Sequence, residues 1–194
     1  MSVFTNEEKV QILSDVVEIE SVNDHEKDVA EYLQKLFNKY DIQSEIISVN
    51  DSDSRANLVA EIGSGSPVLG VSGHMDVVTT GNLDSWNYEP FKLTEDDDGR
   101  LHGRGAADMK SGTVALALAL IEIKEAGTLK QGTIRFMATA GEEITSAGAK
   151  DLYEKGYMDD VDALLIAEPS QDGLVYTFNC QIKCNTLSLK SSAG

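Results

Sequence analysis

The sequence predicts an α/β fold in which a mainly parallel central sheet is flanked by helices. Two helix-like segments open the chain, and short apolar runs of β character then alternate with helical segments. The links between these segments are short, with one long exception. This alternation is typical of parallel sheets whose faces are covered by helices. With 194 residues, 41% of them hydrophobic, the chain can bury one core.

The first two elements are expected to be helices. Thr5 followed by Glu8 has the pattern of a capping box, and apolar residues recur after it at helical spacing. Asn23 followed by Glu26 repeats that pattern, and a second apolar stripe ends near Asp41. Each helix should therefore present one apolar face to the core.

Three short strands are expected next, at residues 42–49, 57–62 and 68–72, because polar and turn-forming residues separate these β-type runs. A long connection follows at residues 79–104. It is too polar and irregular for one continuous element, and loops longer than about 15 residues in a compact domain are usually functional.

The second half of the pattern alternates helix and strand. Residues 113–125 could pass for a strand by their alternation, but their length and their Ala and Leu content favour a largely buried helix. A strand at 133–140, a helix at 146–155 and an apolar strand at 163–167 complete the sheet.

Charge and composition exclude several classes of function. The net charge of −17 would repel nucleic acids and anionic membranes, so neither is expected as a partner. No apolar run approaches the roughly 20 residues that span a bilayer. The first residues lack a basic segment followed by an apolar one, so a cytoplasmic location is expected.

Side chains that can bind a metal ion follow four of the expected strand or turn positions. They are His74 and Asp76 in SGHMDVV, Asp108 in GRGAADMKSG, Glu142 and Glu143 in TAGEEI, and Glu168 in AEPS. Ligands of open α/β sheets bind outside the carboxyl ends of the strands, so these side chains should converge. One such acid alone could be a surface carboxylate or a helix cap, but four coincidences are hard to explain in that way.

His74 and Asp76 are two residues apart, so in an extended chain they project to the same side. Asp76 can then accept a hydrogen bond from the imidazole and fix the tautomer that binds a metal. A hydrogen-bonded core histidine is the alternative for His74, but it leaves the nearby acid unexplained.

Asp108 lies in a glycine-rich turn, where Gly103 and Gly105 allow the backbone to approach a site closely. A carboxylate there can bridge two ions. Asp108 could instead cap the helix that follows, but Ser111 and Thr113 are closer to the expected helix start and better placed for that role.

The adjacent Glu142 and Glu143 cannot both face one point on a regular element, so we expect them to lie in a turn and to have different roles. One would bind metal and the other would take a proton, and a nearby dication would offset their repulsion. Oxygen-rich ligands with one or two histidines suit zinc, cobalt or manganese, and they disfavour a structural thiolate site.

A nucleotide-binding doubly wound domain would have a similar sheet, but this sequence lacks the phosphate-binding loop of such domains. Asp108 stands where the third glycine of a dinucleotide fingerprint belongs, and Lys110 is not preceded by the glycine of a P-loop. No G-x-S-x-G nucleophile elbow occurs either.

Together the motifs resemble those of the M20 metallopeptidase and aminoacylase family, which includes succinyl-diaminopimelate desuccinylases and acetylornithine deacetylases. SGHMDVV, WNYEPF, GRLHGRGAADMKSG, TAGEEITSAGAK and LLIAEPS occur in the family's order and spacing, and the resemblance covers residues 1–171. It implies that His74 and Glu168 hold one divalent ion, that Glu143 helps to hold a second, and that Asp108 bridges them. By the same resemblance Asp76 orients His74, and Glu142 is the general base.

The resemblance also implies an activity and a domain plan. The protein would be a zinc, cobalt or manganese hydrolase that cleaves the amide bond of an N-acyl amino acid or small peptide, and its full-length form would be a homodimer. Residues 1–172 would be the N-terminal part of the catalytic domain, and residues 173–194 the beginning of a lid or dimerisation domain.

Family members are roughly twice this length and take a further histidine ligand from a returning segment. We therefore expect this chain alone to bind one metal better than two. A truncated, noncatalytic metal-binding relative is the alternative.

Overall fold

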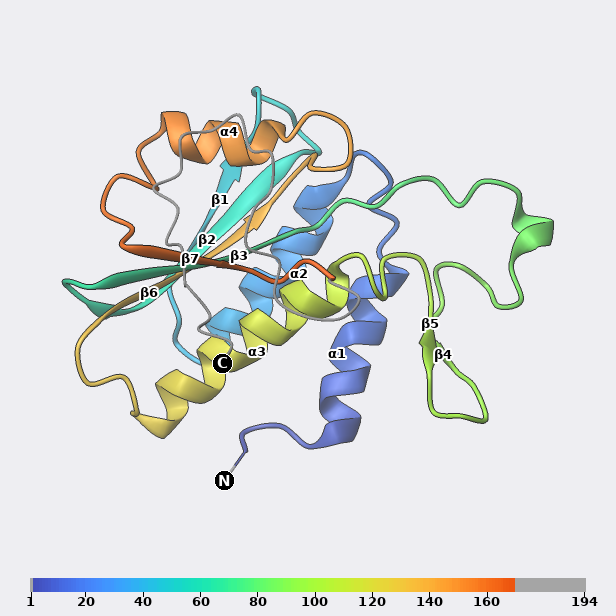
Figure 1. Ribbon diagram of the computed structural model, residues 1–194, viewed down its shortest axis with the longest axis horizontal. Coiled ribbons are helices and arrows are strands. Elements are labelled where there is room, and N and C mark those ends of the chain that lie inside the picture. Colours follow the sequence, from blue (N-terminus) through green and yellow to red (C-terminus); the bar gives the residue numbers. More distant parts are fainter. Residues whose placement is uncertain (1, 170–194) are drawn as a thin grey trace, which may run out of the picture.

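The structure, a computed structural model, describes residues 2–169 (Figure 1). A five-stranded sheet with the order β1-β2-β6-β3-β7 forms its centre. Its strands are Ser44–Ser48 (β1), Ala56–Ser64 (β2), Val68–His74 (β3), Gly132–Thr139 (β6) and Ala163–Ile166 (β7). The α/β class predicted from the sequence is confirmed, but the sheet is mixed and not mainly parallel, because the β1-β2 and β2-β6 pairs are antiparallel. The expected lid segment, residues 173–194, lies outside the described residues.

The sheet is parallel where it carries the candidate site. β3 lies between β6 and β7 and runs parallel to both, with His74 opposite Thr139 and Ser72 opposite Ile166. β1 and β2 instead pair antiparallel, and β2 is antiparallel to β6. The short polar link between β1 and β2 closes a hairpin, because a parallel pair would need a longer crossover.

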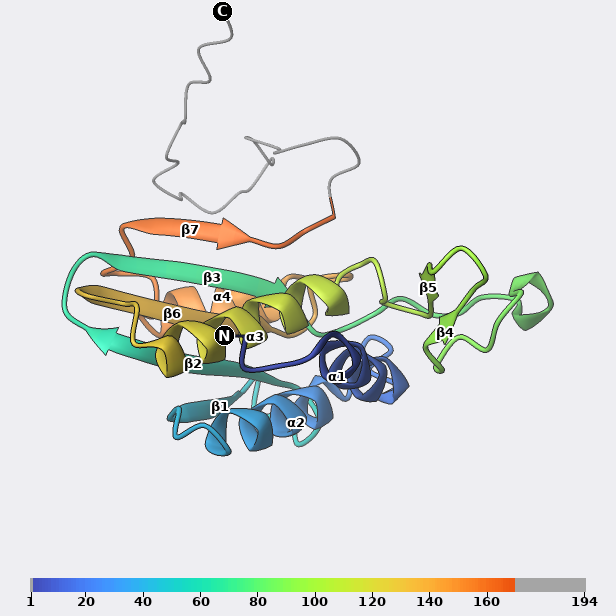
Figure 2. The same ribbon diagram turned by 90° about the horizontal axis from the view of Figure 1, so that it is seen from below.

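Helices cover both faces of the sheet (Figure 2). They are α1 (Asn6–Glu18), α2 (Glu26–Asn38), α3 (Lys110–Ala126) and α4 (Ala147–Glu154). α2 and α3 pack on one face and α1 packs against α3, whereas α4 lies on the other face. No helix within residues 2–169 is long and apolar enough to cross a membrane.

The period of two along the strands divides the sheet's side chains between two clusters. Leu58 of β2 and Phe136 of β6 face α2 and α3, and the Phe136 ring meets that of Phe37 edge to face at 5.3 Å. Val59 and Met137, one residue along, face α4 in the smaller cluster. Each buried large apolar side chain contributes about 1.5–3 kcal/mol, so these two clusters fix the sheet between its helices.

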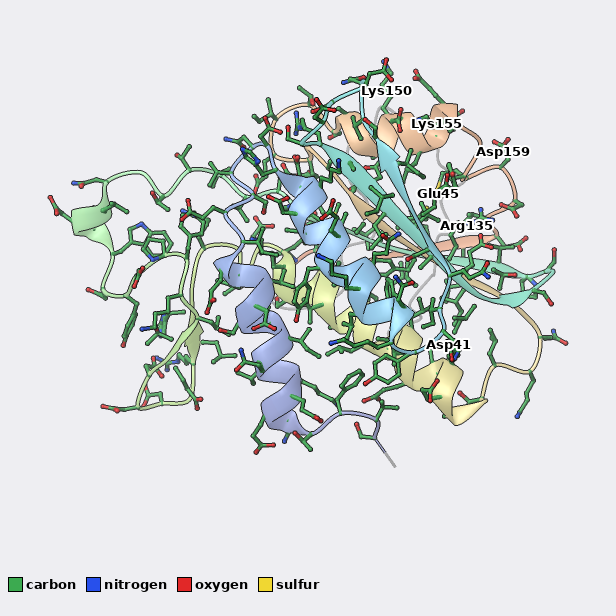
Figure 3. The ribbon with its side chains drawn as sticks, turned by 180° about the vertical axis from the view of Figure 1, so that it is seen from behind. Asp41, Glu45, Arg135, Lys150, Lys155 and Asp159 are labelled. Carbon is green, nitrogen blue, oxygen red and sulfur yellow. The ribbon has the colours of Figure 1, made fainter. Side chains whose placement is uncertain are left out.

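A polar cluster that includes Arg135 and Glu45 lies on the same side of the sheet as α4 (Figure 3). Arg135 of β6 donates to Asp160 Oδ1 at 2.6 Å and pairs with Glu61. It also donates to the main-chain oxygen of Tyr157 at 2.6 Å, and the Tyr157 hydroxyl bonds Glu45 of β1. Arg135 thereby ties the link before β7 to the middle of the sheet.

The helix starts were only partly predicted. The capping box of Thr5 and Glu8 is present at α1. The box expected at Asn23 is wrong, because the backbone of Asn23 is left-handed with φ 52° and α2 begins after His25. Glu26 does not reach back to a cap, since its buried carboxylate pairs with Arg55 at 2.7 Å.

The caps expected for α3 are also wrong. α3 already begins at Lys110, after Met109, and no side chain caps it. Thr113 donates its hydroxyl to the main-chain oxygen of His74 at 3.0 Å, so it ties α3 to the end of β3 instead.

Residues 79–104 extend away from the sheet as a separate lobe (Figure 2). The lobe contains the short helix η1 (Leu83–Ser85) and the strand pair β4 (Thr94–Glu95) and β5 (Leu101–His102). His102 bonds Asp96 at 2.8 Å, and the Arg104 guanidinium lies 5.0 Å from the centre of the Trp86 ring. This long connection is irregular, as the sequence predicted.

Candidate metal centre

The carboxyl ends of the parallel strands bring four of the expected side chains together. His74 ends β3 and is only 2% exposed. Its Nε2 lies 3.3 Å from Asp108 Oδ1, 3.7 Å from Glu168 Oε1 and 3.8 Å from Glu142 Oε2. Residues separated by almost a hundred positions therefore meet around one imidazole nitrogen.

The other ring nitrogen of His74 sets the direction of the imidazole. Nδ1 lies 2.9 Å from the main-chain oxygen of Asp76, and a carbonyl only accepts hydrogen bonds. Nδ1 therefore carries a hydrogen, and Nε2, which faces the three acids, is left as the nitrogen that would donate its lone pair to a metal ion. This is the tautomer that a metal-binding histidine needs.

The role expected for the Asp76 carboxylate needs a correction. It lies 3.6 Å from His74 Nδ1, so the main-chain carbonyl and not the carboxylate accepts the imidazole hydrogen. The carboxylate instead accepts the N–H groups of Glu142 and Glu143 at 3.1 and 3.0 Å. Asp76 is fully buried, and two main-chain donors satisfy its charge.

Three of these residues can share one ion. One ligand atom from each of His74, Asp108 and Glu168 lies within 4.8 Å of the other two. Glu143 lies outside that trio, but its main-chain N–H shares the Asp76 carboxylate with Glu142. Imidazole nitrogen with carboxylate oxygens is a donor set that suits zinc and similar divalent ions.

Electrostatics around the trio also fit a cation. Burial raises the pKa of Glu168; the His74 charge opposes this shift, and the neighbouring acids add to it. Burial likewise raises the pKa of Glu143. Burial lowers the pKa of His74, but the charges of Asp76, Glu168 and Glu142 outweigh it and the net shift is upward. Like charges at close range favour protonation, and a dication would reverse this.

The Gly141 turn before the two glutamates requires a glycine. Gly141 has φ +72°, and a Cβ built there would lie 2.5 Å from Arg55 Nη2. Arg55 is held in turn by Glu26, to which it donates at 2.7 and 3.2 Å. The ion pair thus lies directly against the turn that presents Glu142.

Several supporting residues were missed by the sequence analysis. Their contacts join segments that are far apart in the chain, and no local pattern marks them. They are Ser21, Glu26, Arg55 and Lys110. Only Lys110 carried a signal in retrospect, because it is a charged residue at the start of a helix whose first three turns are otherwise uncharged.

Comparison of the sequence with models of protein families identifies the family of this chain. Residues 70–183 match the model of peptidase family M20/M25/M40. The chain belongs to this family. Members of the family are metal-dependent hydrolases, in agreement with the trio of ligand residues described above.

Individual relatives agree with the family. The chain is 57% identical over 184 residues to a probable succinyl-diaminopimelate desuccinylase of Staphylococcus aureus (strain MRSA252), covering 95% of this chain and 44% of the relative. It resembles the structure of human carnosine dipeptidase 1 with a TM-score of 0.66 and 26% identity, covering 84% of this chain and 38% of that one.

A dinuclear metal binding peptidase of the M20 family from Bacillus subtilis shares the fold, with a TM-score of 0.59 and 21% identity. That match covers 81% of this chain and 41% of the peptidase. The chain thus spans less than half the length of each of these three proteins.

Proposed function

We propose that the chain is the metal-binding part of a hydrolase that cleaves the amide bond of an N-succinyl or other N-acyl amino acid. The observation that carries this proposal is the approach of three carboxylates, from Asp108, Glu142 and Glu168, to within 3.8 Å of His74 Nε2. Metal-assisted hydrolysis uses such a set of ligands together with a free carboxylic acid beside them.

The metal-binding roles can be divided among the residues. His74 and Glu168 would hold one divalent ion, Asp108 would bridge it to a second, and Glu143 would help to hold that second ion. Zinc fits this donor set best, with cobalt or manganese as alternatives. When bound, the ions would supply Lewis acidity that polarises the scissile carbonyl and makes water acidic enough to react at neutral pH.

Glu142 is the residue that we assign to proton transfer. Its side chain is 48% exposed, so it is accessible to a substrate from solvent. Its main chain is fixed by Asp76 at 3.1 Å, so the carboxylate is held beside the ligands while remaining free to move a proton. Glu142 would take a proton from the attacking water and give it to the departing amine.

The choice of substrate class rests on the relatives. The name of the relative that is 57% identical supports an N-succinyl amino acid, although that protein is more than twice as long. The net charge of −17 supports a small-molecule substrate over nucleic acid or an anionic membrane. A cytoplasmic location and a homodimeric full-length form remain predictions from the sequence.

The test compares hydrolysis of N-succinyl-diaminopimelate and N-acetylornithine by the chain and by its full-length coding product, each loaded with zinc. Glu142→Gln should lower kcat by about 10²–10⁴ without lowering the bound metal. The exposed Glu154→Gln is the matched control and should behave like the wild type. Equal rates for the wild type and Glu142→Gln would remove Glu142 from the mechanism, and absence of zinc binding by both wild-type forms would refute the metal centre.

A further inference from the structure

Lys110 is a buried cation beside the candidate metal centre. It is 1% exposed, and within residues 2–169 its ammonium forms no ion pair with a carboxylate. Its Nζ instead donates to the main-chain oxygens of Val16 at 3.0 Å and Ile19 at 2.6 Å. These carbonyls lie at the C-terminal end of α1, where the helix dipole favours a positive charge.

The turn that carries Asp108 closes around the Lys110 side chain. The Lys110 N–H donates to the Gly105 main-chain oxygen at 2.9 Å. A Cβ built at Gly105 would lie 3.1 Å from Lys110 Cδ and 2.6 Å from Val77 Cγ1. Gly105 therefore packs directly against both the Lys110 stem and Val77.

The same lysine reaches the strand end that carries His74 by a second route. After Ile19, the chain continues into a segment that pairs with the residues beyond β3. Ser21 donates its hydroxyl to the Met75 main-chain oxygen at 2.6 Å, and the Val77 N–H donates to the Ser21 main-chain oxygen at 3.0 Å. Met75 lies between His74 and Asp76.

We propose that Lys110 is a positioning residue of the metal centre. Its ammonium fastens the Asp108 turn to the end of α1 and, through Ser21, to the strand end that bears His74. It thereby sets the separation between two ligands on different segments. The inference rests on the proposed function, because it assigns Lys110 a part in metal binding and not in stability alone.

The two roles differ in what they change. A side chain that only stabilises the fold lowers the unfolding temperature when it is removed, but the folded molecules keep the geometry of the ligands. A positioning residue also alters the affinity of the folded protein for metal, since outer partners of metal ligands typically change that affinity by about 10–100-fold. Affinity measured on folded protein therefore separates them.

The experiment compares Lys110→Met with Lys124→Met, a matched control on the partly exposed face of the same helix. For each folded protein, Zn²⁺ affinity is measured by competition with a chromophoric chelator, and the visible spectrum is recorded after loading with Co²⁺. Lys110→Met should bind Zn²⁺ at least about tenfold more weakly and show an altered Co²⁺ spectrum. Lys124→Met should match the wild type in both.

Wild-type affinity and spectrum in folded Lys110→Met, with only a lower unfolding temperature, would overturn the proposal. If Lys110→Met does not fold, Ser21→Ala decides, because it removes the hydroxyl bond to the Met75 main-chain oxygen and leaves both the cation and the Val77 contact in place. Several-fold weaker Zn²⁺ binding by Ser21→Ala supports the proposal, and unchanged binding overturns it. A wild-type protein that binds no Zn²⁺ would instead refute the proposed function itself, and this inference with it.

Discussion

The carboxylate of Asp76 accepts the main-chain N–H of Glu143 at 3.0 Å, so the strand end after β3 is joined directly to the turn after β6. The other carboxylate oxygen accepts the N–H of Glu142 at 3.1 Å. The main-chain carbonyl of the same aspartate holds His74 at 2.9 Å. One buried residue thus sets both the imidazole and the two glutamates.

Asp76→Asn should impair the centre while leaving the sheet intact. The amide retains one acceptor and turns an N–H₂ group toward a main-chain N–H, so one of the two hydrogen bonds is lost. We expect metal affinity or kcat to fall by about 10–100-fold, measured by chelator competition and by initial rates. The exposed Asp97→Asn is the control, and wild-type values for Asp76→Asn would show that the two N–H contacts do not matter.

Gly141→Ala and Gly127→Ala separate backbone strain from collision. Both glycines have positive φ, +72° and +58°, but a Cβ at Gly127 meets nothing within 4 Å, whereas one at Gly141 meets Arg55. Gly127→Ala should cost about 1–2 kcal/mol in the free energy of unfolding by urea. Gly141→Ala should cost more and should also weaken metal binding. Equal losses in the two variants would argue against the contact with Arg55.

Arg55→Met should destabilise the protein through Glu26, whose side chain is fully buried. Removing one partner leaves an uncompensated charge, which typically costs about 3–5 kcal/mol. Arg55 itself is 22% exposed, so we expect the lower part of that range in urea denaturation. Arg100→Met breaks an exposed pair with Asp98 and should change stability by less than about 0.5 kcal/mol. The double variant Arg55→Met with Glu26→Gln should recover part of the loss.

Zinc should raise the unfolding temperature of the chain, and nucleotides should not. A ligand at 100 times its dissociation constant stabilises the folded state by about 2.7 kcal/mol. A chelator should reverse the shift, and His74→Ala, which removes the nitrogen shared by the acids, should abolish it. A shift caused by ATP or NAD and not by zinc would favour the nucleotide-binding alternative.

The sequence predicted the positions of α1 to α4, of the five strands of the central sheet and of the convergence at the strand ends, because these follow from local patterns and one topological rule. It did not predict η1 or the β4-β5 pair within the long connection. Length and the Ala and Leu content identified α3, although its alternation alone could have indicated a strand, and the rule for parallel sheets placed His74 near Glu168. The sequence did not predict the contact between Lys110 and Ile19 or the contact between Arg55 and Glu26. These contacts join segments distant in the chain, and their residue types are common on protein surfaces.

The errors at helix starts have a related cause. Asn23 and Thr113 have the residue types of caps, but their environments gave them other contacts. Thr113 donates its hydroxyl to the main-chain oxygen of His74. Asn23 instead has a left-handed backbone, and its main-chain N–H donates to the Val77 oxygen at 3.1 Å. A capping pattern read from sequence describes what a residue can do for its own helix, and a tertiary hydrogen bond can take precedence over it.

β7 has one neighbour within residues 2–169, and its apolar Leu164, Leu165 and Ile166 are 38%, 45% and 45% exposed. The N–H and C=O groups along its outer edge can form hydrogen bonds with another extended chain. Two copies of the protein that pair along this edge would bury these exposed apolar side chains. Dilution, low temperature and a charged substitution at Leu165 should therefore favour the monomer, and high protein concentration should favour aggregates.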